Sequence, residues 1–295
     1  MKRQWLFYVA MGSVAIAAFA AEMRFAHKVS QQTVVRQLKG LPPGYRTWAL
    51  TSHGQELFVI DGGPWDTKLW QPQLPLPILY RGFRVNTDKE WVMEEFKTKH
   101  TFAQAILAER EQRPDSWLAQ EYGYWLLDEK TNTAYAVKVI FEAQFWSERY
   151  PQVEVIDLPT RQLKKVIKLL PEASFGALAL HPNKTKFYLS VSERDTGGLL
   201  WVYDTATLER IKTIQLNSDL TIEDIHFSKD GRYLFGSERN IVIIDTGEDS
   251  IIGLINPPKD RWFTATIALS PDEREIYVGL QFGMKKGAVA AIDIA

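Results

Sequence analysis

Five histidines and the absence of cysteine limit the chemistry open to this chain of 295 residues. Without cysteine there is no disulfide, thiolate nucleophile, iron–sulfur cluster or covalently attached c-type haem. No two histidines have the spacing at which one helix binds a metal; they are His27, His53, His100, His181 and His226. We expect His53 and His181 to be solvated residues of hairpin turns. We expect His226 to be packed within a strand, with a ligand or metal at a central channel as the alternative.

General acid–base catalysis needs carboxylates and bases that lie close together and have shifted pKa values. The candidates in long polar segments are Asp66, Glu142, Glu148, Arg149, Asp195 and Arg261. The motifs that would organise a reaction, G-x-S-x-G, G-x-G-x-x-G, G-x-x-x-x-G-K-[ST] and H-E-x-x-H, are missing. We therefore expect no catalytic residue, no cofactor and no metal, and enzymatic activity stays an open alternative.

Tryptophan, tyrosine and arginine gather in the segments that connect the expected strands. These residue types carry much of the binding energy at recognition sites, because they combine large apolar area with hydrogen-bond donors. The expected ligand-binding or partner-binding residues are Tyr45, Arg46, Trp65, Trp70, Trp146, Arg149, Arg261 and Trp262. The alternative for each tryptophan is a structural one, in which it covers a hydrophobic gap between neighbouring sheets.

The elements that must position these residues form an internal repeat. Asp157, Asp204, Asp245 and Asp293 recur at intervals of 47, 41 and 48 residues, and apolar strand patterns surround each one. This period is typical of the four-stranded blades of a β-propeller. We expect each repeated aspartate to be structural, its side chain accepting hydrogen bonds from nearby backbone amides in the turn between the third and fourth strands.

The last repeat, GAVAAIDIA (287–295), stops before its fourth strand, and QQTVVRQLKGL (31–41) reads like the missing strand. If residues 33–38 lie beside residues 289–293, the N-terminal strand completes the last blade and closes a ring. The predicted fold is therefore an all-β propeller. Five blades are expected and six are the alternative, with one short helical insertion near 101–113, where a capping box precedes one apolar helical face.

Residues 122–295, together with 31–41, resemble YVTN-type or amine-dehydrogenase-like β-propellers, which are distantly similar to WD-repeat rings. The repeated strand–Asp–turn–strand units quoted above carry this resemblance. It implies a fold and specifies no activity. It also implies two enzymatic alternatives, a propeller subunit of an amine-dehydrogenase-like oxidoreductase and a lactonase-like hydrolase.

The N-terminus has the pattern of an export signal. Lys2 and Arg3 precede an uncharged stretch, residues 4–21, that ends in small residues. We expect a signal peptide (1–21) cleaved after Ala20 or Ala21, a linker (22–30) and one propeller domain (31–295). An uncleaved membrane anchor is the alternative. Either arrangement predicts a periplasmic protein or one tethered to the outer side of the cytoplasmic membrane.

The charge balance gives no indication of a nucleic-acid partner. Lysine and arginine number 35 and aspartate and glutamate 36, so the formal net charge is −1. With no catalytic motif, the predicted function is a noncatalytic exported propeller. We expect one face of loops to bind an extracytoplasmic ligand, another extracytoplasmic protein or a complex.

Overall fold

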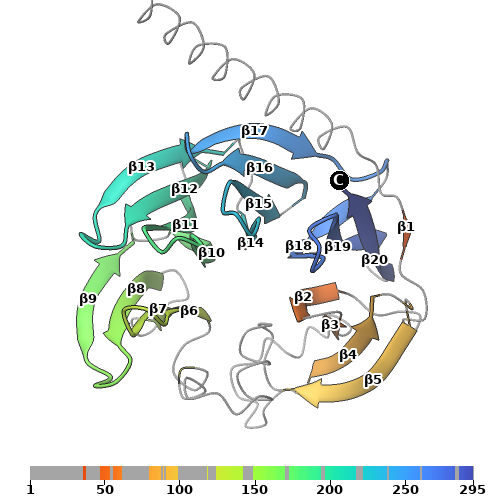
Figure 1. The fold of residues 1–295 in the computed structure, drawn as a ribbon, viewed down its shortest axis with the longest axis horizontal. Coiled ribbons are helices and arrows are strands. Elements are labelled where there is room, and N and C mark those ends of the chain that lie inside the picture. The colour runs from red at the N-terminus through yellow and green to blue at the C-terminus, as the bar shows by residue number, and fades with distance from the viewer. Residues whose placement is uncertain are drawn as a thin grey trace, which may run out of the picture.

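The computed structural model of the chain is built from four-stranded antiparallel sheets, and the predicted propeller fold is confirmed (Figure 1). The structure describes residues 36–37, 47–53, 56–61, 80–87, 89, 91–98, 118, 124–141, 149–169, 173–193, 197–216, 222–237, 239–259, 261–282 and 286–294. The predicted signal segment, the linker and the helical insertion at 101–113 lie outside these ranges.

Within the described ranges there are five such sheets, each a simple up-and-down meander of four strands, which we call blades 1 to 5. Blade 1 contains β2 (Thr47–His53), β3 (Glu56–Asp61), β4 (Tyr80–Asn86) and β5 (Trp91–Thr98). Blade 2 contains β6 (Tyr124–Asp128), β7 (Thr133–Phe141), β8 (Arg149–Asp157) and β9 (Leu163–Lys168). In the described ranges, one blade precedes blade 2 and a long connection separates the two, which agrees with the expected five blades.

The last three blades follow at the repeat period seen in the sequence. Blade 3 contains β10 (Ser174–Leu180), β11 (Lys186–Glu193), β12 (Gly197–Asp204) and β13 (Arg210–Gln215). Blade 4 contains β14 (Asp224–Phe227), β15 (Tyr233–Ser237), β16 (Ile241–Asp245) and β17 (Ser250–Ile255). Blade 5 contains β18 (Trp262–Leu269), β19 (Glu275–Phe282), β20 (Lys286–Asp293) and β1 (Arg36–Gln37).

Blade 5 is assembled from both ends of the chain. Strand β1 pairs with β20 in antiparallel register, with Arg36 opposite Ala291 and Gln37 opposite Ala290. The predicted closure by the N-terminal strand is confirmed at these residues. Figure 1 shows the blades following one another around a common centre, with β2, β6, β10, β14 and β18 innermost.

Much of the hydrophobic core lies between blades, because blades 3, 4 and 5 each pack apolar side chains against a neighbouring blade on both faces. Strand β16 illustrates this: Ile241 and Ile243 pack toward blade 5, and Val242 and Ile244 pack toward blade 3. Period-two alternation therefore separates two apolar faces instead of an apolar and a polar one. Similar apolar clusters join blade 2 to blade 3 and blade 5 to blade 1.

Blade 2 also has a cover on the side that faces away from blade 3. There Leu118, from the connection between blades 1 and 2, is fully buried. It packs in one cluster with Trp125, Ala134 and Ala136 of blade 2. A side chain of the long connection thus supplies apolar contact on this face of the blade.

Two kinds of turn recur at fixed positions in the blades. In the turns between first and second strands, Lys184, Gly231 and Glu273 occupy the same position and have φ values of 63°, 74° and 57°. In the turns between third and fourth strands, a residue with positive φ lies four positions after the repeated aspartate. These residues are Arg161 (φ 58°), Leu208 (φ 58°) and Asp249 (φ 49°).

Candidate functional site

The meander topology sorts the connections of the propeller onto two faces. In an antiparallel four-stranded sheet, the turns between strands one and two and between strands three and four lie at the same end. We call this end the turn face. The connections between strands two and three and those between blades lie at the opposite end, which we call the loop face. Of the predicted binding residues, Arg149, Arg261 and Trp262 lie in the described part of the chain, and all three belong to loop-face connections or their flanks.

Two of the predicted binding residues have described side chains, and they are neighbours in the connection from blade 4 to blade 5. Arg261 and Trp262 are both exposed, and 39% of the surface of Trp262 is accessible to solvent. The next residue, Phe263, is 2% exposed and packs between blades 4 and 5. Alternation along the strand therefore turns Trp262 away from the core between blades 4 and 5.

The connection that carries Arg261 and Trp262 is stiff. Pro257 and Pro258 fix two backbone φ angles, and the Arg261 amide donates a hydrogen bond to the Pro258 carbonyl at 3.2 Å, closing a turn. Trp262 then enters the sheet directly, opposite Gln281 of β19. Both side chains thus leave a backbone whose conformation is already set.

The other predicted binding residues are less fully placed. Arg149 begins β8 on the loop face, opposite Phe141, and its side chain is not among those described. The remaining five, Tyr45, Arg46, Trp65, Trp70 and Trp146, lie outside the described residues, as do the acid–base candidates Asp66, Glu142, Glu148 and Asp195.

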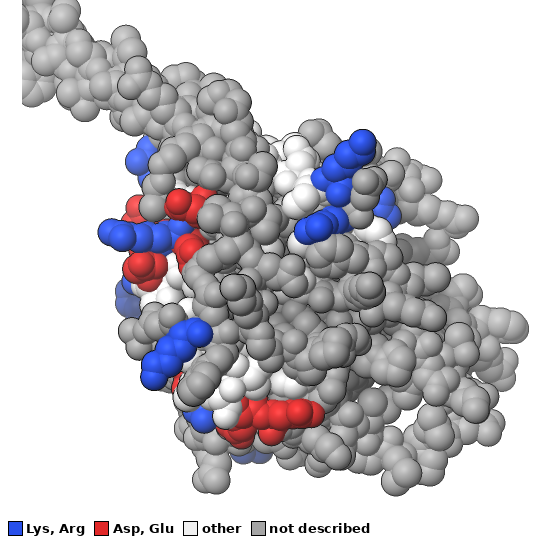
Figure 2. All heavy atoms as spheres, turned by 90° about the vertical axis from the view of Figure 1, so that its right-hand side faces the viewer, with Lys and Arg blue, Asp and Glu red and all other residues white. Residues whose placement is uncertain are grey.

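Basic residues add to the loop face at the end of blade 4. Arg239 follows β15, and Lys259 and Arg261 follow β17, and all three are exposed. Figure 2 labels no single residue; in its view lysine and arginine side chains lie at the upper right, and acidic and basic side chains lie together at the left. Glu238 and Asp260 alternate with these residues in the sequence, so the two segments carry a formal charge of 3 − 2 = +1. The charge of this region is therefore close to balanced.

On the turn face, two of the repeated aspartates, Asp204 and Asp245, hold turns together as predicted. Asp204 accepts hydrogen bonds from the Ala206 and Thr207 amides at 2.9 and 2.7 Å. Asp245 accepts from the Gly247 and Glu248 amides at 2.8 and 2.9 Å. The Thr207 backbone and side-chain hydrogen bonds lower the pKa of Asp204 below its ordinary value. The prediction of a structural role is confirmed for these two aspartates.

Asp157 departs from this pattern. Its Oδ1 atom is buried and has no hydrogen-bond partner among the described residues. At the other turn of blade 2, Asp128 has the capping role, because it accepts hydrogen bonds from the Lys130 amide at 3.2 Å and the Thr131 hydroxyl at 2.7 Å. The turns of blade 2 therefore resemble those of blades 3 and 4 less than the repeated aspartate in the sequence suggests.

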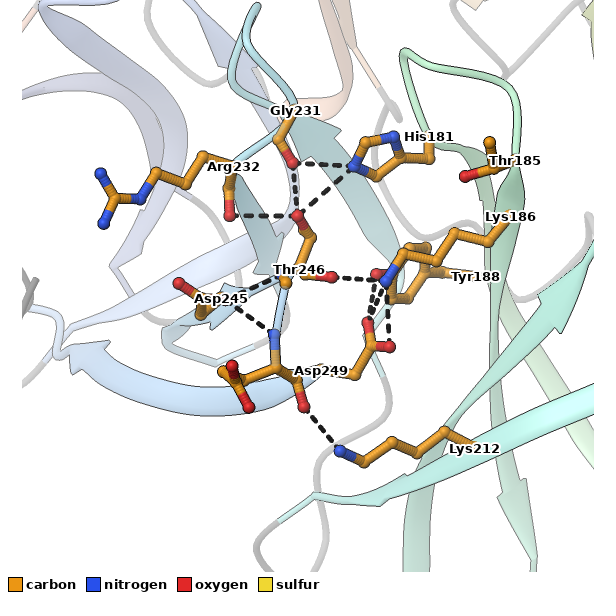
Figure 3. A network of polar contacts seen from close by, with 12 residues as sticks. His181, Thr185, Lys186, Tyr188, Lys212, Gly231, Arg232, Asp245, Thr246 and Asp249 are labelled. Atoms are coloured by element: carbon orange, nitrogen blue, oxygen red, sulfur yellow. Dashed lines mark hydrogen bonds and ion pairs between the residues drawn. The ribbon is translucent and has the colours of Figure 1, made fainter. Parts of the chain in front are cut away.

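A polar network joins blades 3 and 4 beneath the turn face (Figure 3). The Lys186 ammonium of β11 lies 2.8 and 2.9 Å from the two carboxylate oxygens of Asp249, and it donates to the Thr246 carbonyl. The Tyr188 hydroxyl donates to the same carboxylate. Burial, and then the Asp249 hydrogen bond and charge, raise the pKa of Tyr188 far above its ordinary value, so this phenol stays protonated.

His181 belongs to this network, and the expectation of a solvated turn residue is wrong. The residue is 6% exposed. Its Nε2 atom lies 2.9 Å from the Gly231 carbonyl, and its Nδ1 atom accepts a hydrogen bond from the Asn183 amide at 3.2 Å. These partners require the neutral tautomer with hydrogen on Nε2. The imidazole is therefore engaged in holding the turns of blades 3 and 4 together.

Near the ring axis, titratable side chains lie on the innermost strands. The Tyr124 hydroxyl of β6 donates to the Leu178 carbonyl of β10 at 2.8 Å. Asp224 of β14 accepts a hydrogen bond from the Ile267 amide of β18 at 3.0 Å. His226 lies two residues after Asp224, with Nε2 3.6 Å from Oδ2. The expectation that His226 packs within a strand is confirmed, and its partner is this carboxylate.

The chemistry that these arrangements allow is limited. In the described part of the chain, no three histidine or acidic side chains converge to hold a metal ion. The same residues contain no helix that is long and apolar enough to cross a membrane. The described carboxylates, lysines and tyrosines mostly pair across blade junctions or close turns, whereas Arg261 and Trp262 lie exposed on the loop face.

Comparisons with known proteins add a likeness of fold. No protein-family model matches the chain, and no curated protein matches its sequence. Among solved structures, the chain is similar to Kuenenia stuttgartiensis hydrazine synthase, with 13% sequence identity and a TM-score of 0.44. The similarity covers 81% of this chain and 68% of that chain. A likeness at this level carries no argument about activity.

The contact between Gly231 and His181 gives a direct test of the network. A Cβ atom on Gly231 would lie 2.7 Å from His181 Cε1, at a φ of +74° that side chains rarely adopt. Gly231→Ala should therefore lower the free energy of unfolding by about 1–3 kcal/mol, measured by denaturant unfolding. Gly247→Ala is the matched control, because this exposed glycine meets only Asp245 Oδ1 at 3.2 Å. Equal losses in the two variants would contradict the proposed role of the Gly231–His181 contact.

Proposed function

We propose that this protein is an exported, noncatalytic β-propeller that binds another extracytoplasmic protein through its loop face. The observation that carries the proposal is the exposed pair Arg261 and Trp262 on a connection stiffened by Pro257 and Pro258. Tryptophan and arginine are among the residue types most enriched at the energetic centres of protein interfaces. A preset backbone also reduces the entropy lost on binding.

The contrast between the two faces supports the choice of the loop face. On the turn face, polar side chains already close turns: Ser228 donates to Asp230 at 2.6 Å, and Ser270 donates to Asp272 at 2.8 Å. Such groups would have to break internal hydrogen bonds to bind a partner. Trp262 needs no such rearrangement, because its surface is already accessible.

A protein partner fits the charge of the region better than a nucleic acid. The whole chain has a net charge of −1, and the segments around Arg239 and Arg261 are close to balance. A mixed charged rim around an aromatic side chain is typical of protein interfaces, whereas nucleic-acid sites need a continuous basic surface.

Tryptophan replacement tests the binding surface. Trp262→Ala and Arg261→Ala should each weaken binding to a partner, first captured with the full-length protein from membrane and periplasmic fractions and then purified, by roughly tenfold or more. Binding is measured by calorimetry. Ile211→Ala is the control, since Ile211 is 57% exposed on the outermost strand of blade 3, away from the loop face. Unchanged affinity in the Trp262 and Arg261 variants, at an unchanged melting temperature, would exclude this surface.

Export is proposed from the N-terminal pattern of Lys2, Arg3 and the apolar stretch 4–21. The mature protein recovered from an exporting cell should begin at Ala21 or Glu22, as read by N-terminal sequencing or intact mass. Retention of residues 1–21 in the membrane fraction would support the uncleaved anchor instead. Recovery of the full chain in the cytosol would contradict export.

A further inference from the structure

The innermost strands of neighbouring blades are connected by a recurring polar bridge. Tyr124 and Asp224 lie at the same position in their blades, four residues before the residue that opens the first turn, Asp128 and Ser228 respectively. Each side chain forms a hydrogen bond with the backbone of the first strand of the next blade, at the residue that follows the equivalent position there. Tyr124 donates to the Leu178 carbonyl, and Asp224 accepts from the Ile267 amide.

The bridge from blade 4 to blade 5 differs because it depends on a charged group. Asp224 Oδ1 accepts from the Ile225 amide at 3.0 Å, and Oδ2 accepts from the Ile267 amide at 3.0 Å. His226 Nε2 lies 3.6 Å from Oδ2. The side chains of Asp224 and His226 are only 18% and 28% exposed, so solvent compensates the carboxylate poorly. His226 is thus positioned to supply the opposing charge.

In the described part of the chain, few other titratable groups lie on the elements that pack against this pair. Strands β10 and β18, which pack against β14, contain no acidic, basic or tyrosine residue. On β15, the paired strand, only Tyr233 is titratable, at the turn end. Tyr124 of β6 is a neutral phenol, because burial and then the Asp224 charge raise its pKa. Glu223 precedes β14 and is exposed.

The direction of the His226 pKa follows from two opposing causes. Burial favours the neutral imidazole and lowers the pKa, but the charge and hydrogen bond of Asp224 outweigh burial, and the pKa is raised above its ordinary value. A group whose pKa is raised by folding stabilises the fold fully below its unfolded pKa of about 6.5. That stabilisation is lost as the pH rises through the folded pKa.

We propose that Asp224 and His226 form a pH-sensitive latch between blades 4 and 5. With His226 protonated, the imidazolium compensates the carboxylate that holds the Ile267 amide of β18. When His226 loses its proton, the half-buried carboxylate is left without compensation, which favours openings that admit water and release that amide. The latch goes beyond the proposed function and does not depend on the loop face binding a partner.

Hydrogen exchange of the β18 segment, residues 262–269, tests the latch between pH 6 and pH 8.5. After correction for the intrinsic exchange rate, protection in the wild-type protein should fall as pH rises. The fall should be about tenfold for each pKa unit by which folding raises the His226 pKa. His226→Gln should remove the pH dependence. Tyr124→Phe is the control, because it breaks the equivalent uncharged bridge and should leave that pH dependence unchanged.

The outcome that overturns the latch is equally defined. Protection of residues 262–269 that does not change with pH in the wild type would exclude it, as would an unchanged pH dependence in His226→Gln. If His226→Gln does not fold, the proton NMR titration of the wild-type imidazoles decides, with His226 assigned by nuclear Overhauser contacts to β14. A midpoint at or below the ordinary histidine value would overturn the proposal, and a raised midpoint would support it.

Discussion

The pairing of β1 with β20 is the constraint on which the ring depends. Blade 5 has three strands from the C-terminal end and one from the N-terminal end, with Arg36 opposite Ala291 and Gln37 opposite Ala290. Without β1, the backbone groups on one edge of β20 would be unpaired, and such an edge invites association with other chains. Because the two strands lie at opposite ends of the sequence, their pairing has a high loop-closure cost, which the apolar clusters between blades must offset. Closure therefore links the stability of the first and last blades.

Polar contacts between blades fix how neighbouring blades are oriented against each other, in addition to the apolar packing. Lys165 and Lys212 each lie eight residues after a repeated aspartate, on the outermost strands of blades 2 and 3. Lys165 donates to the Leu208 carbonyl at 3.1 Å, and Lys212 donates to the Glu248 carbonyl at 2.6 Å, in both cases to a turn of the next blade. These lysines satisfy backbone carbonyls at or next to the residue of each turn that has a positive φ, Leu208 and Asp249. Together with the network around Lys186 and the bridges near the axis, they give each junction in blades 2 to 5 a fixed register.

Local signals in the sequence were sufficient to predict the blades. They were not sufficient to predict the polar contacts between blades. Period-two apolar patterns and turn aspartates such as Asp204 and Asp245 act within one blade, so the strands, the two turns and the closing strand could be found from sequence alone. The burial of His181 could not, because its partner Gly231 is fifty residues away in another blade. The same holds for Asp224 with Ile267. At the loop face, Arg261 and Trp262 could be predicted from their residue types. The structure was needed to show that Trp262 is exposed and that the next residue, Phe263, is buried.

The most direct test of the ring is a disulfide across its closure, for which the cysteine-free chain is well suited. Arg36→Cys with Ala291→Cys joins two directly paired positions, and Cβ atoms of directly paired positions in an antiparallel sheet are close enough for a disulfide. Arg36→Cys with Ala290→Cys shifts the register by one residue and places the sulfurs on opposite faces. The closed ring predicts rapid oxidation of the first pair, detected by mass spectrometry, and little oxidation of the second in the folded protein. Equal oxidation of the two pairs, or none in either, would contradict closure by β1.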